Sequence, residues 1–302
     1  MEVLSVLMDP ILPVFAILAF GFVLGRRGSI TIEDARVINR FAMSVLLPIL
    51  IFGVLIDAPI REFETRPFLI YVAGEAVIFA IGFLLAHRVF AREAGEAVLL
   101  AFCGIFANNV FYGLPIMVIL YGPENVLPVT SVITLDSTLT FGGALIALQI
   151  IRLGRVTPAR LARTILGTPI LQAMILGLIV NLAAVEIPKP VETFIGFNGA
   201  AGAPVALFAL GVVMSQTVFR AEATVITFTL IKLFLFPAVI AIGLLYGAPG
   251  APGTAQYVMA SAGPAGAMAF SLALLHGIRT DAIAQVIVWT SLFTLITLAL
   301  LA

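Results

Sequence analysis

Three ionisable side chains and a pair of asparagines lie inside segments that are otherwise apolar. Glu75, Asp136 and Lys232 each stand within long hydrophobic runs, and Asn108 and Asn109 are adjacent in the motif "FANNVFYGLP". A charge at the centre of a bilayer costs at least about 2.5–3.5 kcal/mol, so residues of this kind pair with one another or mark a functional path. Carboxylates, an ammonium group and amides in such places can bind protons, ions or a polar solute.

The composition indicates that these residues belong to a membrane-embedded chain. Of the 302 residues, 62% are hydrophobic and 11% are charged, and the mean hydropathy is +1.18. Soluble domains average about 45–50% apolar and about 25% charged residues. The formal net charge is zero and there is no basic run, which argues against a nucleic-acid partner. The single cysteine and the two histidines show no ligand spacing, so we expect no metal site and no cofactor.

A membrane-spanning helix needs about 20 mostly apolar residues, and segments of that kind recur along the whole chain. Ten are predicted, at residues 5–25, 37–57, 67–89, 95–121, 127–151, 165–185, 192–217, 223–247, 254–276 and 280–301. The connections between them are too short to hold a soluble domain. We therefore expect an all-α polytopic membrane protein, with one domain (1–302) in the lipid bilayer of the cell (inner or plasma) membrane.

Basic residues are unevenly distributed over the predicted connections. The connections that follow spans 1, 3, 5, 7 and 9, counted with the span ends beside them, hold twelve arginines, whereas the opposite connections hold three basic residues. Basic residues concentrate on the cytoplasmic side of membrane proteins. Both chain termini are therefore predicted to lie on the outer side.

The two halves of the chain share short matches at a nearly constant offset. "PILIF" in span 2 corresponds to "PVALF" in span 7, 156 residues later. The end of span 4 (107–122) corresponds to the end of span 9 (262–277), 155 residues later. This pattern predicts two five-helix repeats, residues 1–151 and 152–302. Because five is an odd number, the second repeat must be inverted in the membrane, as in many secondary transporters.

Spans 4 and 9 carry helix-breaking residues at corresponding places. Span 4 has Gly113 and Pro115 after its two asparagines, and span 9 has Gly263 and Pro264. Proline removes a helical hydrogen bond, and freed backbone groups persist at membrane depth only where protein or a watery cavity satisfies them. Two such breaks that cross near the midplane turn helix N-termini, with their partial positive charge, toward one cavity. We expect an anion site there, with the two asparagine amides as donors.

These motifs resemble the auxin efflux carrier family, which includes bacterial malonate or organic-anion permeases. The matching stretches are "FANNVFYGLPIMVILYG" in span 4, "KLFLFP" (232–237) in span 8 and "ASAGPAGAMAFSLALLHG" (260–277) in span 9, and "RFAMSVLLPILIF" (40–52) fits as well. The resemblance implies the fold of bile-acid sodium symporters and sodium–proton antiporters, with crossed broken helices 4 and 9. It also implies a scaffold of spans 1, 2, 6 and 7, able to form a homodimer, and an elevator-like transport domain of spans 3–5 and 8–10.

The resemblance further implies roles for particular residues. The two asparagines fall in the family's helix 4 asparagine region, and the prolines of spans 4 and 9 fall near its crossover prolines. Polar residues of span 5 face the substrate in plant members, and the corresponding stretch here is "TLDSTLTF". The implied substrate-binding residues are Asn108, Asn109, Gly113, Pro115, Asp136, Ser137, Gly263 and Pro264.

The three buried ionisable residues are expected to serve ion coupling or to support the site. Glu75, Asp136 and Lys232 fall in spans 3, 5 and 8, all within the implied transport domain. One hypothesis is a proton or cation site beside the crossover, with Asp136 crossing the membrane as a neutral acid so that it does not repel a carboxylate. The other hypothesis is a purely structural charge pair, with Lys232 extending toward the membrane surface.

The sequence argues against two function classes and leaves variants of a third open. An intramembrane enzyme needs a nucleophile and a base at bilayer depth, but both histidines lie where apolar runs end. A sensor needs an output domain, which the short connections cannot hold. We expect no enzyme but a secondary transporter for a small organic anion, most simply a carboxylate, proton-coupled or uniport. A sodium-coupled symporter of the same fold is the alternative, and the substrate and direction of transport stay open.

Overall fold

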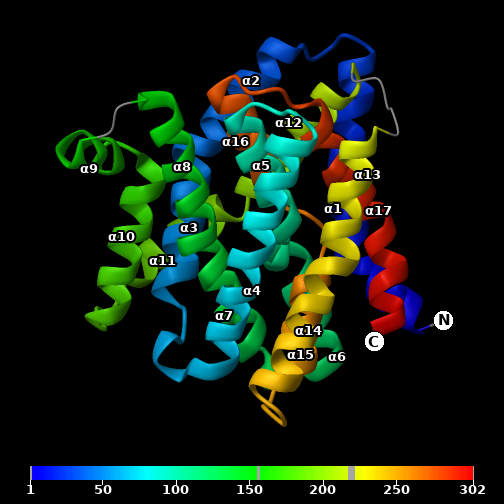
Figure 1. Cartoon of the computed structure of the whole chain (residues 1–302). Helices are drawn as coiled ribbons and strands as arrows, with labels where there is room; N and C mark the ends of the chain where they lie inside the picture. The colour runs from blue at the N-terminus through cyan, green and yellow to red at the C-terminus, as the bar shows by residue number, and fades with distance from the viewer. Residues whose placement is uncertain (1, 155–156, 217–221, 302) are drawn as a thin grey trace.

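The computed structural model describes residues 2–154, 157–216 and 222–301, which form a bundle of helices (Figure 1). The α-helices are α1 (Glu2–Arg26), α2 (Ile32–Phe41), α3 (Leu47–Ile56), α4 (Thr65–Leu84), α5 (Ala94–Ile105), α6 (Leu114–Tyr121), α7 (Leu127–Leu135), α8 (Phe141–Leu153), α9 (Pro158–Leu166), α10 (Pro169–Leu182), α11 (Lys189–Gly199), α12 (Gly202–Met214), α13 (Ala223–Leu230), α14 (Phe236–Gly247), α15 (Thr254–Ala262), α16 (Met268–His276) and α17 (Asp281–Leu301). Wider π-helical turns are η1 (Ala42–Leu46), η3 (Leu85–Val89), η4 (Asn109–Gly113), η6 (Asp136–Thr140) and η7 (Ile231–Leu235). Short 3₁₀ turns are η2 (Ile60–Glu62) and η5 (Pro123–Asn125).

Each predicted span coincides with one helix or with consecutive helices. Within the described ranges, five helical stretches are long and apolar enough to cross a membrane: Ile32–Ile56, Thr65–Val89, Leu127–Leu153, Lys189–Met214 and Ala223–Gly247. Shorter apolar helices, such as α5 and α10, lie between them. The chain is therefore a multi-pass membrane protein. The count of ten spans and the inverted repeat stay predictions.

Two span boundaries differ from the predicted ones for local chemical reasons. α2 begins five residues before residue 37 because Thr31 and Asp34 form a capping box. Thr31 Oγ1 accepts a hydrogen bond from the backbone N–H of Asp34 at 3.1 Å, and Asp34 Oδ2 accepts one from the backbone N–H of Thr31 at 2.9 Å. The predicted span 165–185 is interrupted because Pro169 starts α10 and holds Thr168 in an extended conformation.

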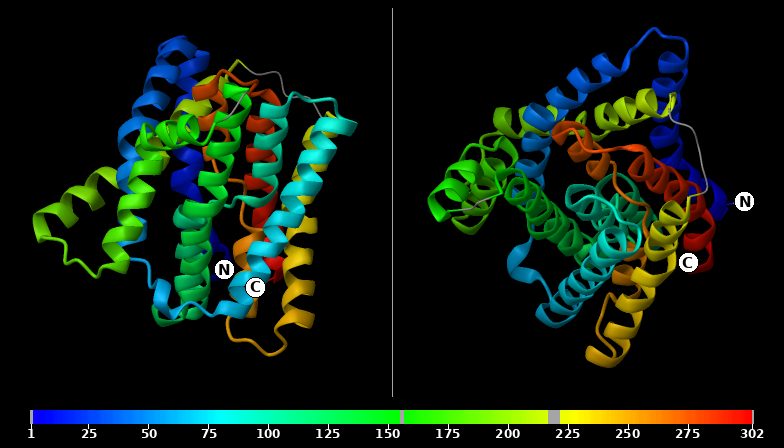
Figure 2. Two further views of the ribbon diagram at one scale, coloured as in Figure 1. Left: turned by 60° about the vertical axis from the view of Figure 1, so that its left-hand side comes forward. Right: turned by 45° about the horizontal axis from the view of Figure 1, so that its top comes forward.

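The helices pack in two sets. In one set, α1 packs along α12, and α3 packs against α10 and α11. In the other, α4 packs against α5 and α14, and α13 packs against α17. α10 and α11 lie at one edge of the molecule in both views of Figure 2. A buried contact joins the two sets, since Asn39 Nδ2 on α2 donates a hydrogen bond to the carbonyl of Ser271 on α16 at 3.0 Å.

The chain termini lie near one end of the bundle. α1 begins and α17 ends there, whereas the α1–α2 and α16–α17 connections lie at the opposite end (Figure 1). These two connections contain Arg27 and Arg279, and Arg26 ends α1 beside them. This arrangement agrees with an even number of membrane crossings.

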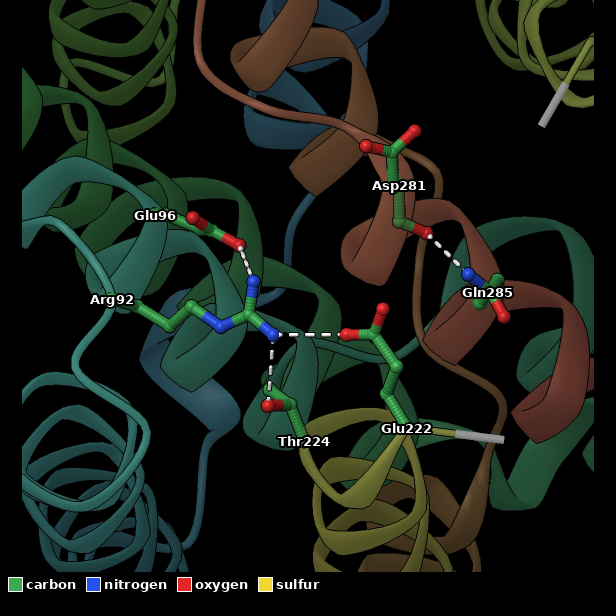
Figure 3. Close-up of polar contacts among 6 residues, drawn as sticks. All are labelled: Arg92, Glu96, Glu222, Thr224, Asp281 and Gln285. Atoms are coloured by element: carbon green, nitrogen blue, oxygen red, sulfur yellow. Dashed lines mark hydrogen bonds and ion pairs between the residues drawn. The ribbon is translucent and has the colours of Figure 1, made fainter. Parts of the chain in front are cut away.

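Arg92 joins the beginnings of α5 and α13 (Figure 3). Its guanidinium donates to Glu96 on α5 at 3.2 Å, and to Glu222 and Thr224 at 3.0 Å each. Glu222 directly precedes α13, and Thr224 lies in its first turn. One cation therefore fixes the relative positions of two helices that are far apart in the sequence, and both lead toward the interrupted region of the fold. In the same view, Gln285 Nε2 donates to the carbonyl of Asp281 at 3.3 Å.

α1 and α12 approach closely at glycines. A methyl group at Gly211 would overlap the backbone of α1 at Leu18 and Phe22, and one at Gly21 would overlap the backbone of α12 at Phe208. The two helix axes can approach this closely only because neither glycine carries a side chain. Small residues serve this purpose in membrane helix packing generally.

Substitution of Gly211 by alanine is expected to destabilise the protein by about 1–3 kcal/mol, the usual cost of overpacking. Thermal unfolding of the detergent-solubilised protein measures the effect. Gly196→Ala is the matched control, because a methyl group at that α11 position meets open space. Equal melting temperatures for the Gly211→Ala and Gly196→Ala proteins would contradict the proposed role of the close approach.

Candidate functional site

The two predicted helix breaks are present, and they touch each other. Residues 106–108 separate α5 from η4, and residues 263–267 separate α15 from α16. The two extended segments run antiparallel: the backbone N–H of Asn108 donates to the carbonyl of Pro264 at 2.9 Å, and that of Gly266 donates to the carbonyl of Phe106 at 3.2 Å. These bonds satisfy backbone groups that the breaks would otherwise leave free at membrane depth. We call this paired region (106–108 with 263–267) the crossover.

Lys232 binds the ends of the two helices that lead into the crossover. Its Nζ donates to the carbonyl of Ile105, the last residue of α5, and to that of Ser261 near the end of α15, at 3.0 Å each. The side chain is fully buried, and the ring centroid of Phe236 lies 4.8 Å from Nζ. Because a helix C-terminus carries a partial negative charge, the ammonium stabilises both ends. Lys232 therefore does not extend toward the membrane surface, which was one of the expectations.

A small cavity of about 50 Å³ lies against the other side of the crossover. Its lining includes Asn108 and Asn109 at the start of η4, and Gly266, Ala267 and Met268 at the start of α16. Backbone N–H groups at helix starts have no intrahelical acceptor and carry partial positive charge. The described lining contains no lysine, arginine or histidine. Its affinity for a negative group must therefore come from helix ends and amides.

A second cavity of about 490 Å³ adjoins the first. Leu50, Val54 and Val110 line both of them. A water molecule needs roughly 10–15 Å³ of such space, so the small cavity has room for only a few atoms, and the larger cavity has room for a small molecule. Asp57 and Glu192 also line the larger cavity. Burial, and then the negative charge of Glu192, raise the pKa of the Asp57 carboxyl.

The two adjacent asparagines have different surroundings. Asn109 is 2% exposed, and its Nδ2 donates to Asp136 Oδ2 at 3.3 Å. Asn108 is half-buried, and its side chain makes no hydrogen bond to the described residues. Asn108 therefore has the amide that is free to bind a solute, whereas Asn109 connects the small cavity to Asp136. The sequence left open which of the two asparagines faces the cavity.

The other predicted binding residues have distinct places. Ser137 lines the small cavity from η6. Gly113 makes room for Asn109, because a methyl group at position 113 would overlap Oδ1 of that amide. Gly263 lies in the crossover, and Pro264 supplies the carbonyl that binds Asn108. Pro115 belongs to the first turn of α6, and its side chain lies outside the described residues.

The two predicted acids lie behind the crossover and do not line the small cavity. Glu75 is 5% exposed and Asp136 is 3% exposed, and both meet at η6, which Asp136 begins and Thr140 ends. Thr140 Oγ1 donates to Glu75 Oε2 at 2.5 Å. The ion pairs found among the described residues do not include Lys232, whose ammonium binds carbonyls instead. Asp136, which was expected to face the substrate, reaches the cavity only through Asn109.

Three residues of this region lie in π-helical turns. Asn109 starts η4, Asp136 starts η6, and Lys232 is the second residue of η7. Such turns are rare, widen the helix locally and are frequent at functional sites. The sequence analysis did not foresee them, because no periodicity or residue type marks a five-residue turn within an apolar run.

An all-helical membrane chain in which two interrupted helices meet beside a cavity has the construction of a secondary transporter. The chain belongs to the auxin efflux carrier family, described as "Membrane transport protein", which matches residues 6–155 and 153–302. The resemblance seen in the sequence is thus confirmed. The protein is a membrane transporter and not an enzyme.

Several relatives align over most of the chain. A "Putative malonate transporter" of Rhizobium meliloti (strain 1021) is 24% identical over 304 residues, which cover 95% of this chain and 92% of the relative. An "Uncharacterized transporter" of Methanothermobacter thermautotrophicus is also 24% identical, with 97% and 96% covered. The "Uncharacterized transporter YfdV" of Escherichia coli (strain K12) is 26% identical, with 80% and 79% covered.

Substitution of Lys232 by methionine is expected to lower the thermal stability strongly. It leaves two buried carbonyls without their donor, at about 1–3 kcal/mol each, and leaves the two buried acids without their cation. Thermal unfolding measures the loss, and hydrogen exchange should increase first in residues 106–108 and 263–267. Lys189→Met is the control, because Lys189 is exposed and its 3.1 Å pair with Glu192 is a surface ion pair. A melting temperature of Lys232→Met equal to that of Lys189→Met would show that the ammonium does not hold the crossover.

Proposed function

We propose that the protein carries a small organic anion, a carboxylate, across the cell membrane. The observation that carries this proposal is the small cavity at the crossover, where two helix starts and the free amide of Asn108 converge without a basic side chain in the described lining. A carboxylate accepts hydrogen bonds from such N–H groups, and the dipoles of both helices favour its charge. The Rhizobium meliloti relative, a "Putative malonate transporter", supports the same substrate class, because malonate is a carboxylate.

The neighbouring cavity favours an acid of low charge. Asp57 and Glu192 line it, and the described lining contains no basic residue. A solute with several negative charges would be repelled there, whereas a monoanion with an apolar body would meet mainly Leu50, Val54 and Ile195. The preferred substrate is therefore a monocarboxylate or a half-protonated dicarboxylate.

The proposed mechanism is elevator-type alternating access. The small cavity has one wall from α3 and α12 and the other from the crossover, so it lies between the two packing sets. The set with α1, α3, α10, α11 and α12 would be the scaffold (spans 1, 2, 6 and 7), and the set with α4–α8 and α13–α17 would move. In this proposal the two repeats are residues 1–151 and 152–302. The termini face the outer side of the inner membrane. Two copies of the chain can form a dimer through their scaffold helices.

Proton coupling or uniport fits the buried charges better than sodium coupling does. The two buried acids exceed the ammonium of Lys232 by one negative charge, and a single proton removes that excess without the several oxygen ligands that a sodium ion needs. Among the described residues, no group of three or more His, Cys, Asp or Glu could hold a metal ion. A sodium-coupled symporter of the same fold is the rival that transport assays must test.

Asn108→Ala is expected to weaken carboxylate binding by about tenfold or more, since a hydrogen bond to a charged group contributes about 1.5–3 kcal/mol. Calorimetric titration of the purified protein with malonate, acetate and an aromatic acid gives the affinity and the preferred size. Asn198→Ala is the matched control, because that amide binds only the carbonyl of Phe194 in its own helix among the described residues. A wild-type affinity in Asn108→Ala would remove this residue from the binding site.

Uptake into proteoliposomes tests the coupling. We expect flux of the bound carboxylate that does not depend on a sodium gradient and that increases with an inward proton gradient. Sodium and potassium gradients of equal size, at one pH on both sides, are the matched conditions. Flux that requires sodium at constant pH would favour the symporter alternative.

A further inference from the structure

Two carboxyl groups are buried behind the crossover at the same helical turn. Glu75 Oε1 and Asp136 Oδ1 are buried, and neither has a hydrogen-bond partner in the described part of the chain. Their other oxygens accept hydrogen bonds from Thr140 and Asn109. Asp136 and Thr140 begin and end η6, so Glu75, which binds Thr140, lies near Asp136. Two ionised carboxylates placed in this way repel each other, because both are acceptors. One added proton turns this repulsion into a hydrogen bond.

The charge balance of the cluster points to the same number of protons. Lys232 is the buried cation of this region, so with Lys232, Glu75 and Asp136 all ionised the net charge is −1. The other titratable groups that face the cluster are Tyr71 on α4 and Cys103 on α5, which are neutral in their ordinary forms. Tyr257 on α15 faces Tyr71 and bonds to Ser131. An uncompensated buried charge is costly, and a single proton makes the cluster neutral.

The pair also lies between two separate cavities. Glu75 and Thr140 line a cavity of about 350 Å³ between α4 and the η6–α8 region. Asn109 lines the small cavity at the crossover, and the two cavities share no described lining residue. Thr140 binds Glu75 on the side of one cavity, and Asn109 binds Asp136 on the side of the other. The pair therefore has a neighbouring cavity that the proposed anion does not occupy.

We propose that Glu75 and Asp136 together hold one exchangeable proton, and that this proton controls the affinity of the small cavity for the anion through Asn109. The anion in this proposal is the carboxylate of the proposed function. With the proton bound, the cluster is neutral, and the Asn109 amide is held less tightly by Asp136. Without it, a net negative charge lies behind the site and repels the anion.

The joint binding of one proton and one anion balances in charge and in protons. One proton leaves the solvent and becomes the O–H group between the two carboxyls, and one monoanion enters the small cavity. The two added charges sum to zero, so the pair of binding events does not add net charge to the membrane interior. Because linkage is reciprocal, bound anion strengthens proton binding by the same factor as bound proton strengthens anion binding.

Calorimetric titration with malonate in buffers of different ionisation enthalpy counts the protons bound with each anion. Across a pH series, the wild-type protein should take up as much as one proton per anion, with a dissociation constant that increases about tenfold per pH unit above the transition. Glu75→Gln makes the cluster neutral without a proton. It should therefore bind with no proton uptake, and more tightly than the wild type at high pH.

The remaining variants separate this role from a structural one. Asp136→Asn should also abolish proton uptake, and Thr140→Val, a milder change, should shift the pH dependence without removing it. Glu62→Gln alters an exposed acid and should behave as the wild type does. A merely structural role would weaken binding in Glu75→Gln at every pH. Wild-type proton uptake in Glu75→Gln would overturn the proposal.

A measurement without ligand distinguishes this proposal from the proposed function. In infrared spectra of the unliganded protein, the shared proton gives a carboxylic acid C=O band that should vanish in Glu75→Gln and in Asp136→Asn, and persist in Glu62→Gln. If the band is present but no carboxylate binds, the substrate class is wrong and the shared proton stands. If the wild type lacks the band at every pH at which it is folded, the shared proton is refuted whatever the protein carries.

Discussion

The structure depends on satisfying the backbone groups that two broken helices free inside the membrane. Each unsatisfied group there costs several kcal/mol. The breaks at 106–108 and 263–267 donate hydrogen bonds to each other. The Lys232 ammonium donates hydrogen bonds to carbonyls of the two helices that precede them. Neither break can therefore persist alone, which makes the two halves of the chain dependent on each other. Everything proposed for the site follows from this junction, because the same breaks create the helix starts that face the small cavity.

The buried lysine sets the electrostatics of the region. Its charge lies at helix ends of negative character, and it needs compensation in a medium where lone charges are costly. Glu75 and Asp136 compensate it, but two acids exceed one ammonium by one negative charge. A site for one proton is the simplest way to remove that excess. In the proposed mechanism, proton coupling would therefore be a consequence of how the crossover is stabilised.

Much of this architecture could be predicted from the sequence, because apolar runs form membrane helices, and glycine or proline residues within them break those helices. The apolar runs located the helices, the motifs of spans 4 and 9 located the breaks, and charge within apolar segments singled out Glu75, Asp136 and Lys232. The partners of Lys232 were not predictable, since they are carbonyls 127 and 29 residues away that no residue type reveals. The division between Asn108 and Asn109 depends on extended backbone followed by a π-helical turn, which leaves no periodic signal.

In the proposed site, recognition of charge is separate from recognition of shape. Helix starts, the Asn108 amide and the acids behind them would respond to the negative charge of a solute, and these are largely backbone and buried polar groups. The walls opposite, from α3 and α12, are apolar and present side chains such as Leu50, Val54 and Leu207. Substitutions on those walls change the space available to the body of the solute without disturbing the junction.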